Sequence, residues 1–219
     1  MTETASRQLS APVGNFRRTR DLLAAYHPIW RIDWSGGNDP ASGIAQATSP
    51  TAWIGLGPDG ALVMAATAPR HHVGSLDSGV GLRQADFPAA LWPLQVAMAL
   101  ASRLDLLGLR TRLAWPSTLL RDGVKIGSVR CAISGDWLRV HASVELPGAI
   151  DMMPSLVQGV LTVIESPWRR DLLLRYYNEW CVLHDEPEGG IIALDGDLLL
   201  MRLANGGAIP LDSGCAYNE

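Results

Sequence analysis

The stretch that most constrains the fold is residues 113–129, which read LAWPSTLLRDGVKIGSV. The dipeptide Asp122-Gly123 lies between two apolar runs, and this arrangement is a strong short-range signal for a β-hairpin. We expect one strand over residues 110–115. Pro116 ends it, because proline has no backbone N–H to donate to a neighbouring strand.

The second strand of this hairpin is expected over residues 125–129. Gly127 lies within it, and a glycine there leaves space for a close approach to the backbone. Lys125 stands beside that space, so the pattern predicts a site for an anionic ligand. The alternative is that Lys125 is an exposed edge residue that protects the strand from pairing with another chain.

Composition limits the class of protein and its partners. With 219 residues, 47% of them hydrophobic, the chain can bury one sizeable core and add a small appendage. The net charge of −4 makes nucleic acid a poor partner. No apolar run approaches the length of a membrane span, so no membrane partner is expected. Three cysteines without framework spacing predict reduced thiols and a cytoplasmic protein.

The order of elements predicts an α+β fold. Residues 87–107 form the clearest helix, because apolar residues cover most of its circumference and must be buried against a sheet. Helices and hairpins alternate without a regular βαβ repeat, which favours a mixed β-sheet with helices packed on one face. The other expected helices are residues 20–26, 154–164 and 169–184, and the expected strands are residues 29–34, 51–56, 61–66, 137–146, 191–193, 198–203 and 208–211.

Three parts of the chain are expected from these patterns. Residues 1–18 are a flexible N-terminal tail, residues 19–186 the main core, and residues 187–219 a small C-terminal β-domain. Short strands joined by glycine-rich turns mark the last part.

Trp115-Pro116, the Asp-Gly turn and Lys125-Ile126-Gly127 resemble the signature hairpin of the biotin and lipoate protein ligases. In that family the pattern runs Lys-Trp-Pro-Asn-Asp, a few apolar residues, a turn and then Lys-x-x-Gly. The resemblance covers residues 91–214. It implies a biotin ligase-like core, similar to that of class II aminoacyl-tRNA synthetases, followed by an SH3-like β-appendage.

The resemblance also implies a function and roles for residues. The function is ATP- and Mg²⁺-dependent activation of a small carboxylic acid, such as biotin or lipoate, and acyl transfer to a lysine of a biotinyl or lipoyl carrier domain. Lys125 would stabilise charge on the activated carboxylate. The substrate-binding or nucleotide-binding positions would be Trp115, Pro116, Ser117, Thr118 and Gly127. Exposed edge strands in such a fold allow a homodimer.

Several signature positions differ from the family pattern. Ala114 replaces the lysine before Trp-Pro, and Ser117-Thr118 replace Asn-Asp, so no carboxylate is offered there to magnesium. Residues 41–57 contain no arginine where the family has an arginine-rich phosphate loop. A competing hypothesis is therefore a catalytically degenerate relative that binds a carrier domain or partner protein. Residues that might replace the missing loop are Arg70, His71, His72 and Arg83.

A second enzyme hypothesis is octanoyl or lipoyl transfer without ATP. Lys125-Ile126-Gly127-Ser128 also resembles the octanoyl transferase hairpin, and Cys131 follows on the same strand. A thiolate there would take the acyl group as a thioester. The even spacing of Lys125 and Cys131 puts both on one strand face, about 20 Å apart. Cys131 is better explained as a small buried hydrophobe.

A metal site is the weakest of the hypotheses. Cys181 and His184 stand three residues apart at the end of a helix, so both side chains would face one ion. Zinc needs two further ligands, such as Cys215 or Asp185, and the sequence contains no second paired motif.

Overall fold

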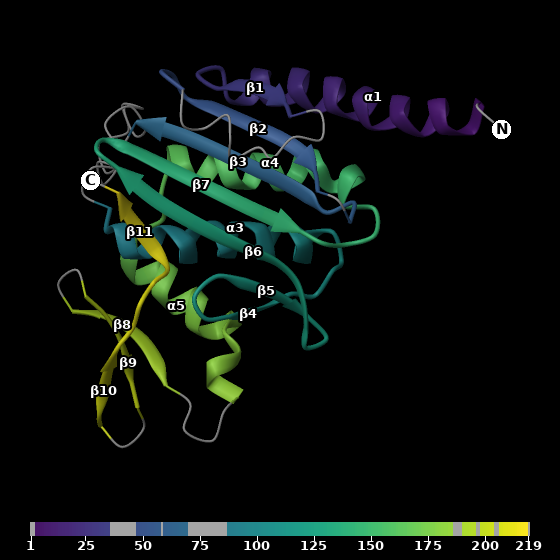
Figure 1. Cartoon of the computed structure of the whole chain (residues 1–219). Coiled ribbons are helices and arrows are strands. Elements are labelled where there is room, and N and C mark those ends of the chain that lie inside the picture. The colour runs from purple at the N-terminus through teal and green to yellow at the C-terminus, as the bar shows by residue number, and fades with distance from the viewer. Residues whose placement is uncertain are drawn as a thin grey trace.

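A computed structural model of the chain describes residues 3–35, 47–57, 59–69, 87–185, 190–195, 198–203 and 206–218. These residues form a large mixed sheet, a layer of helices and a second, smaller sheet (Figure 1). The predicted α+β fold is confirmed.

The large sheet has both parallel and antiparallel strands. Its strands are β1 (Arg31–Trp34), β2 (Thr51–Leu56), β3 (Leu62–Pro69), β4 (Arg112–Ala114), β5 (Thr118–Arg121), β6 (Val124–Ser134), β7 (Trp137–Val144) and β11 (Cys215–Asn218). They follow the order β1-β2-β3-β7-β6-β5-β4, and β11 pairs with β6 beside this path. β1 is parallel to β2 and β11 to β6, whereas the other pairs are antiparallel.

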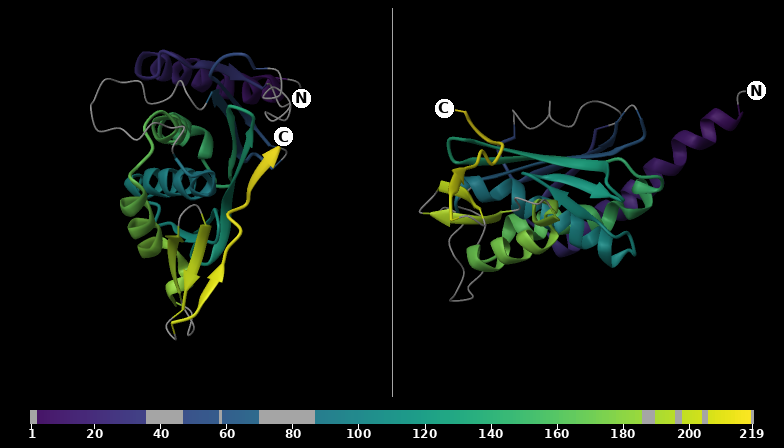
Figure 2. Two further views of the ribbon diagram at one scale, coloured as in Figure 1. Left: turned by 90° about the vertical axis from the view of Figure 1, so that its left-hand side faces the viewer. Right: turned by 90° about the horizontal axis from the view of Figure 1, so that it is seen from below.

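The helices cover one face of this sheet. They are α1 (Glu3–Tyr26), η2 (Ala89–Leu91), α3 (Trp92–Leu106), α4 (Ala149–Glu165), α5 (Arg170–Trp180) and η3 (Val182–Asp185). The left view of Figure 2 shows α3, α4 and α5 on the same side of the strands. α1 packs against α4 and β1. None of the helices in the described part of the chain is long and apolar enough to cross a membrane.

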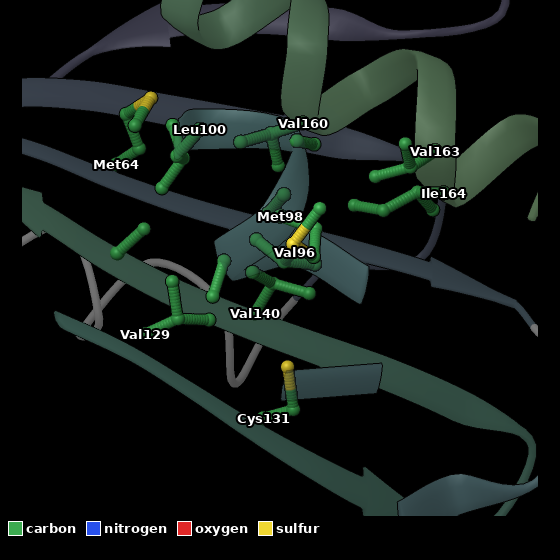
Figure 3. Close-up of a cluster of buried hydrophobic side chains, with 14 of the residues drawn as sticks. Met64, Val96, Met98, Leu100, Val129, Cys131, Val140, Val160, Val163 and Ile164 are labelled. Carbon is green, nitrogen blue, oxygen red and sulfur yellow. The ribbon is translucent and has the colours of Figure 1, made fainter. Parts of the chain in front are cut away.

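The core lies between the sheet and these helices. α3 is buried along most of its length, as its apolar circumference predicts, and Gly108 with a φ of 80° follows its end. Figure 3 shows side chains of β6 and β7 pointing toward those of α3 and α4. They belong to one continuous cluster of buried residues that includes Val96, Leu100, Val129, Cys131, Val140 and Val160.

The small C-terminal sheet confirms the predicted β-appendage. It contains β8 (Ile191–Asp195), β9 (Leu198–Arg202) and β10 (Ala208–Pro210), paired antiparallel in the order β10-β9-β8. Asn178 of α5 anchors it, because its side-chain amide donates to the carbonyl of Ile192 and its oxygen accepts from the Ile192 N–H, both at 2.8 Å. β11 then returns to the large sheet. The division into three parts remains a prediction.

Two local expectations are wrong. The first helix begins at Glu3 rather than at Arg20. Phe16 accounts for part of the earlier start. Its buried ring packs against that of Trp34, with the ring centroids 5.3 Å apart, and this contact stabilises the helix before Arg20. The strand expected to end at residue 115 does not pair with β6, because β5 lies between them. The Asp122-Gly123 turn joins β5 to β6 as predicted.

Glu165, at the end of α4, holds the segment that follows α1. Its Oε2 lies 2.9 Å from Nδ1 of His27, and its Oε1 accepts a 2.9 Å hydrogen bond from the indole of Trp30. The side chains of His27 and Trp30 are buried and cannot reach water. Glu165 therefore supplies the hydrogen-bond partner that each of them needs.

Glu165→Ala therefore leaves two buried nitrogen atoms unpaired, and we expect a loss of about 2–3 kcal/mol in the free energy of unfolding. Urea denaturation measures it. Glu179→Ala is the matched control, because Glu179 pairs with Arg175 on the exposed face of α5 and should contribute about 0.5 kcal/mol at most. Equal losses in the two variants would contradict the role given to Glu165.

Candidate functional site

The sheet face opposite the helices carries a polar cluster. Along β6 and β7 the side chains alternate between the two faces of the sheet. The side chains that do not enter the core therefore point away from the helices. Arg130 pairs in register with His141, Ser128 with Ser143, and Ala132 with Arg139. We call this surface the polar sheet face, defined by Ser128, Arg130, Arg139, His141 and Ser143.

Arg139 has an unused donor on this face. Its Nε is buried and has no hydrogen-bond partner among the described residues. A buried, charged N–H donor without an acceptor costs stability, and a bound anion would supply the acceptor. β3 places Thr67 beside Arg139 and Ala65 beside His141. These small neighbours leave the cationic groups uncovered by large side chains from β3.

Lys125 lies on the same side of the sheet. Leu119 is buried and pairs with Gly127, whereas the next residue, Leu120, pairs with Lys125 across a register shift. Lys125 therefore faces away from the core. It is exposed, and no hydrogen bond or ion pair joins its amine to any described residue. The structure thus brings Lys125 to the side that carries the arginines.

The expectation that Lys125 and Cys131 share a strand face is wrong. Strict alternation would place them together, but the extra residue at the register shift reverses the faces. Cys131 points into the core instead, as predicted for a small hydrophobe. Burial, with the neighbouring Cys215 thiol, raises its pKa well above the usual range, which disfavours the thiolate that acyl transfer needs.

The Trp-Pro turn is bound into the fold. The peptide bond Trp115-Pro116 is cis and lies between β4 and β5. The hydroxyl of Tyr177 donates to the carbonyl of Pro116 at 2.7 Å, and the indole of Trp115 donates to the carbonyl of Asp212 at 3.0 Å. Ser117 is buried, and its hydroxyl donates to the Val129 carbonyl at 2.7 Å.

These contacts separate the predicted ligand-binding residues into two groups. Trp115, Pro116 and Ser117 join α5, β6 and the C-terminal segment, and their polar groups are used within the protein. Thr118 pairs in register with Ser128, which puts it beside the polar sheet face. Thr118 therefore lies on the side of the sheet that carries Lys125, whereas the hydroxyl of Ser117 is bound inside the protein.

Gly127 has a structural explanation. A Cβ atom at this position would collide with the carbonyl oxygen of Ser143 and would lie 3.0 Å from Cδ1 of Leu119. The group that approaches the backbone here is therefore the neighbouring strand β7. A bound substrate is not needed to account for this glycine.

Other predicted sites fall partly outside the described residues. Among the described side chains, no group of three or more His, Cys, Asp or Glu could hold a metal ion. The side chains of His184 and Asp185 are not described, so the zinc hypothesis stays untested in that part. The remaining expected residues beyond the description are Arg70, His71, His72, Arg83 and residues 41–46 of the arginine-free segment.

Sequence reasoning missed Arg130, Arg139 and His141. The signal was available in the strand of residues 137–144, which alternates polar and apolar side chains as WLRVHASV. Arg139 and His141 stand two residues apart in this half-buried strand, which places both side chains on one face.

The overall fold is that of the biotin protein ligases. No protein-family model matches the sequence, and no curated protein matches it. Three solved structures with the same fold are enzymes from different organisms. A biotin protein ligase from Leishmania major in complex with biotin is 15% identical, with a TM-score of 0.53 over 84% of this chain and 98% of that one.

The other two neighbours are equally distant in sequence. The biotin protein ligase from Aquifex aeolicus in complex with biotin and ATP is 14% identical, with a TM-score of 0.54 over 85% of this chain and 95% of that one. A biotin acetyl coenzyme A carboxylase synthetase from Helicobacter pylori with bound biotinylated ATP is 16% identical, with a TM-score of 0.55 over 83% and 99%. Such identities show the fold and leave the reaction open.

Gly127→Ala tests the packing explanation for this glycine. The new methyl group meets the backbone of β7, which cannot yield as a flexible side chain would, so we expect a loss of about 2–3 kcal/mol in unfolding free energy. Gly14→Ala is the control, because nothing lies within 4 Å of a Cβ there and the residue is helical. It should raise stability by about 0.5–1 kcal/mol. A stable Gly127→Ala variant would show that β7 is free to move.

Proposed function

We propose that this chain is a biotin/lipoate protein ligase-like enzyme that activates a small carboxylic acid with ATP and passes the acyl group to a carrier-domain lysine. The observation that carries the proposal is the cationic arrangement of Lys125, Arg130 and Arg139 on the helix-free side of the sheet. Solved neighbours with this fold hold biotin, ATP or biotinylated ATP.

The chemistry needs positive charge where these residues lie. A carboxylate oxygen of the acid attacks the α-phosphorus of ATP, and pyrophosphate leaves to give an acyl-adenylate. Negative charge accumulates on the phosphoryl oxygens during this step. A lysine amine or a guanidinium group on this face can stabilise it. The carrier lysine then attacks the acyl carbon, forming an amide and releasing AMP.

Magnesium enters the proposal only with the nucleotide. Ser117-Thr118 supply no carboxylate, and the described side chains contain no cluster of three or more metal-ligating groups. The residues described therefore do not form a dedicated magnesium site, and no step is assigned to the ion. Mg²⁺ would arrive bound to the triphosphate as part of the substrate.

A second candidate function is non-catalytic binding of a small acid, a carrier domain or another partner protein. The structure favours it at one point, because the Trp-Pro turn has an internal structural role that would be needed without any chemistry. The arginine-free segment is consistent with it, since it offers no guanidinium group to phosphate.

Lys125→Ala distinguishes the two functions. The protein is incubated with MgATP and, separately, with biotin, lipoate and octanoate, and mass spectrometry detects the acyl-adenylate. In a ligase the substitution should lower adenylate formation at least about 100-fold, as for other oxyanion-stabilising groups. Arg121→Ala is the control, because Arg121 is exposed in the same hairpin and does not share the face of Lys125.

Lys125 also permits a direct occupancy measurement. It is the only lysine in the 219 residues, so an amine-reactive reagent labels it and the N-terminal amine alone. Protection of Lys125 by acid and MgATP supports the ligase. Full adenylate formation by Lys125→Ala would refute its role, and absence of adenylate with every acid would favour the binding protein.

Arg139→Gln tests the anion site independently of catalysis. Loss of the half-buried guanidinium removes a charge-assisted hydrogen bond to the acid, so calorimetric titration should show roughly 10-fold weaker binding of the acid. Arg175→Gln is the control, because Arg175 pairs with Glu179 on α5, one of the helices that cover the opposite face of the sheet. Unchanged affinity in Arg139→Gln would contradict binding of the acid at the polar sheet face.

A further inference from the structure

Two cysteines far apart in the sequence meet on neighbouring strands. β11 runs parallel to β6, and Cys215 is the direct register partner of Cys131 (Figure 1). Neighbouring strands lie about 4.8 Å apart. A disulfide needs a Cα separation of roughly 4.4–6.8 Å, so these two residues satisfy the main geometric condition without movement of the backbone.

The two side chains also share a face of the sheet. Partners in register point to the same side, and Figure 3 shows the sulfur of Cys131 directed toward the helix layer. Cys131 is 3% exposed, whereas Cys215 is half-buried at the edge of the core. The thiols are close enough to interact electrostatically, because Cys215 contributes to the raised pKa of Cys131.

The third cysteine lies in a different environment. Cys181 follows α5 and bridges to Leu113 of β4, and it interacts with the hydroxyl of Tyr177. It is buried. The chain therefore contains one adjacent thiol pair and one separate thiol, and Cys181 provides a matched control within the same molecule.

β11 has a position from which a covalent bond would matter. The segment immediately before it contributes the Asp212 carbonyl that accepts the hydrogen bond from Trp115. Gly214 lies against the ring of Pro116, since a Cβ atom there would be 3.3 Å from Cγ of Pro116. Fixing Cys215 to β6 would therefore fix the C-terminal segment against the Trp-Pro turn.

We propose that Cys131 and Cys215 form an oxidisable dithiol site, whose disulfide locks the C-terminal strand onto β6. The oxidant is a peroxide. The thiolate of Cys215, the more accessible thiol, attacks one peroxide oxygen and becomes a sulfenic acid, and with one proton the other oxygen leaves as water. The sulfur of Cys131 then attacks that of Cys215, and the sulfenic hydroxyl leaves with the thiol proton as a second water. The two thiols lose two electrons and hydrogen peroxide gains them.

The bond would close a long loop of chain. Residues 131–215 include β7, α4, α5 and the small sheet. Closing a loop of this length restricts the unfolded chain strongly, so the oxidised protein should be the more stable form. Reduction would remove only the covalent link, because β11 and β7 both pair with β6 in the structure, where the two thiols are free.

The test uses the full chain treated with hydrogen peroxide, then alkylated, digested without reductant and analysed by mass spectrometry. We expect one cross-linked peptide pair containing Cys131 and Cys215. The melting temperature should rise by roughly 5–10 °C and return to its starting value with dithiothreitol. Cys215→Ser should lose both effects, whereas Cys181→Ser should keep them.

A measurement without variants covers the case in which Cys215→Ser fails to fold. Thiols of the oxidised wild-type protein are counted by alkylation in denaturant, and we expect only Cys181 to react. A bridge that includes Cys181, a bridge between two molecules, or oxidation of Cys215 without loss of the Cys131 thiol would each overturn the proposal. Catalytic assays play no part, so the result is independent of the ligase assignment.

Discussion

The hydrogen-bonded ladders of β6 are the interaction on which the rest of the structure depends. β6 pairs with β7 on one side and with both β5 and β11 on the other. The approach of β7 is so close that only glycine fits at position 127. Residues of β6 that point inward pack against α3, and those that point outward carry part of the polar sheet face. One strand thus joins the core, the candidate site and the C-terminus.

The register shift in the β5–β6 hairpin decides what chemistry this strand can support. Without the extra residue, Lys125 would share the inner face with Cys131. With it, the amine joins the arginines on the outer face and the thiol remains in the core beside Cys215. A single bulge therefore puts Lys125 on the side of the polar sheet face and leaves Cys131 on the opposite side of β6, beside Cys215 of β11.

Local patterns in the sequence predict most of this fold. The burial of α3 follows from its apolar circumference, and the Asp122-Gly123 turn follows from turn chemistry. What the sequence hides is non-local. Nothing near residue 117 indicates that the hydroxyl of Ser117 is bound to β6, and nothing near Cys215 indicates a return to Cys131. Such pairings depend on the tertiary fold rather than on neighbouring residues.

The parts of the signature hairpin differ in what they indicate about function. Trp115 and Pro116 are held by Asp212 and Tyr177, so the fold requires this turn whether or not the protein binds a substrate. Their presence is evidence for the architecture. Lys125 is exposed, makes no hydrogen bond or ion pair with the described residues, and is the only lysine in the chain. Packing does not account for it, so the proposed function depends on Lys125 and the arginines of the polar sheet face.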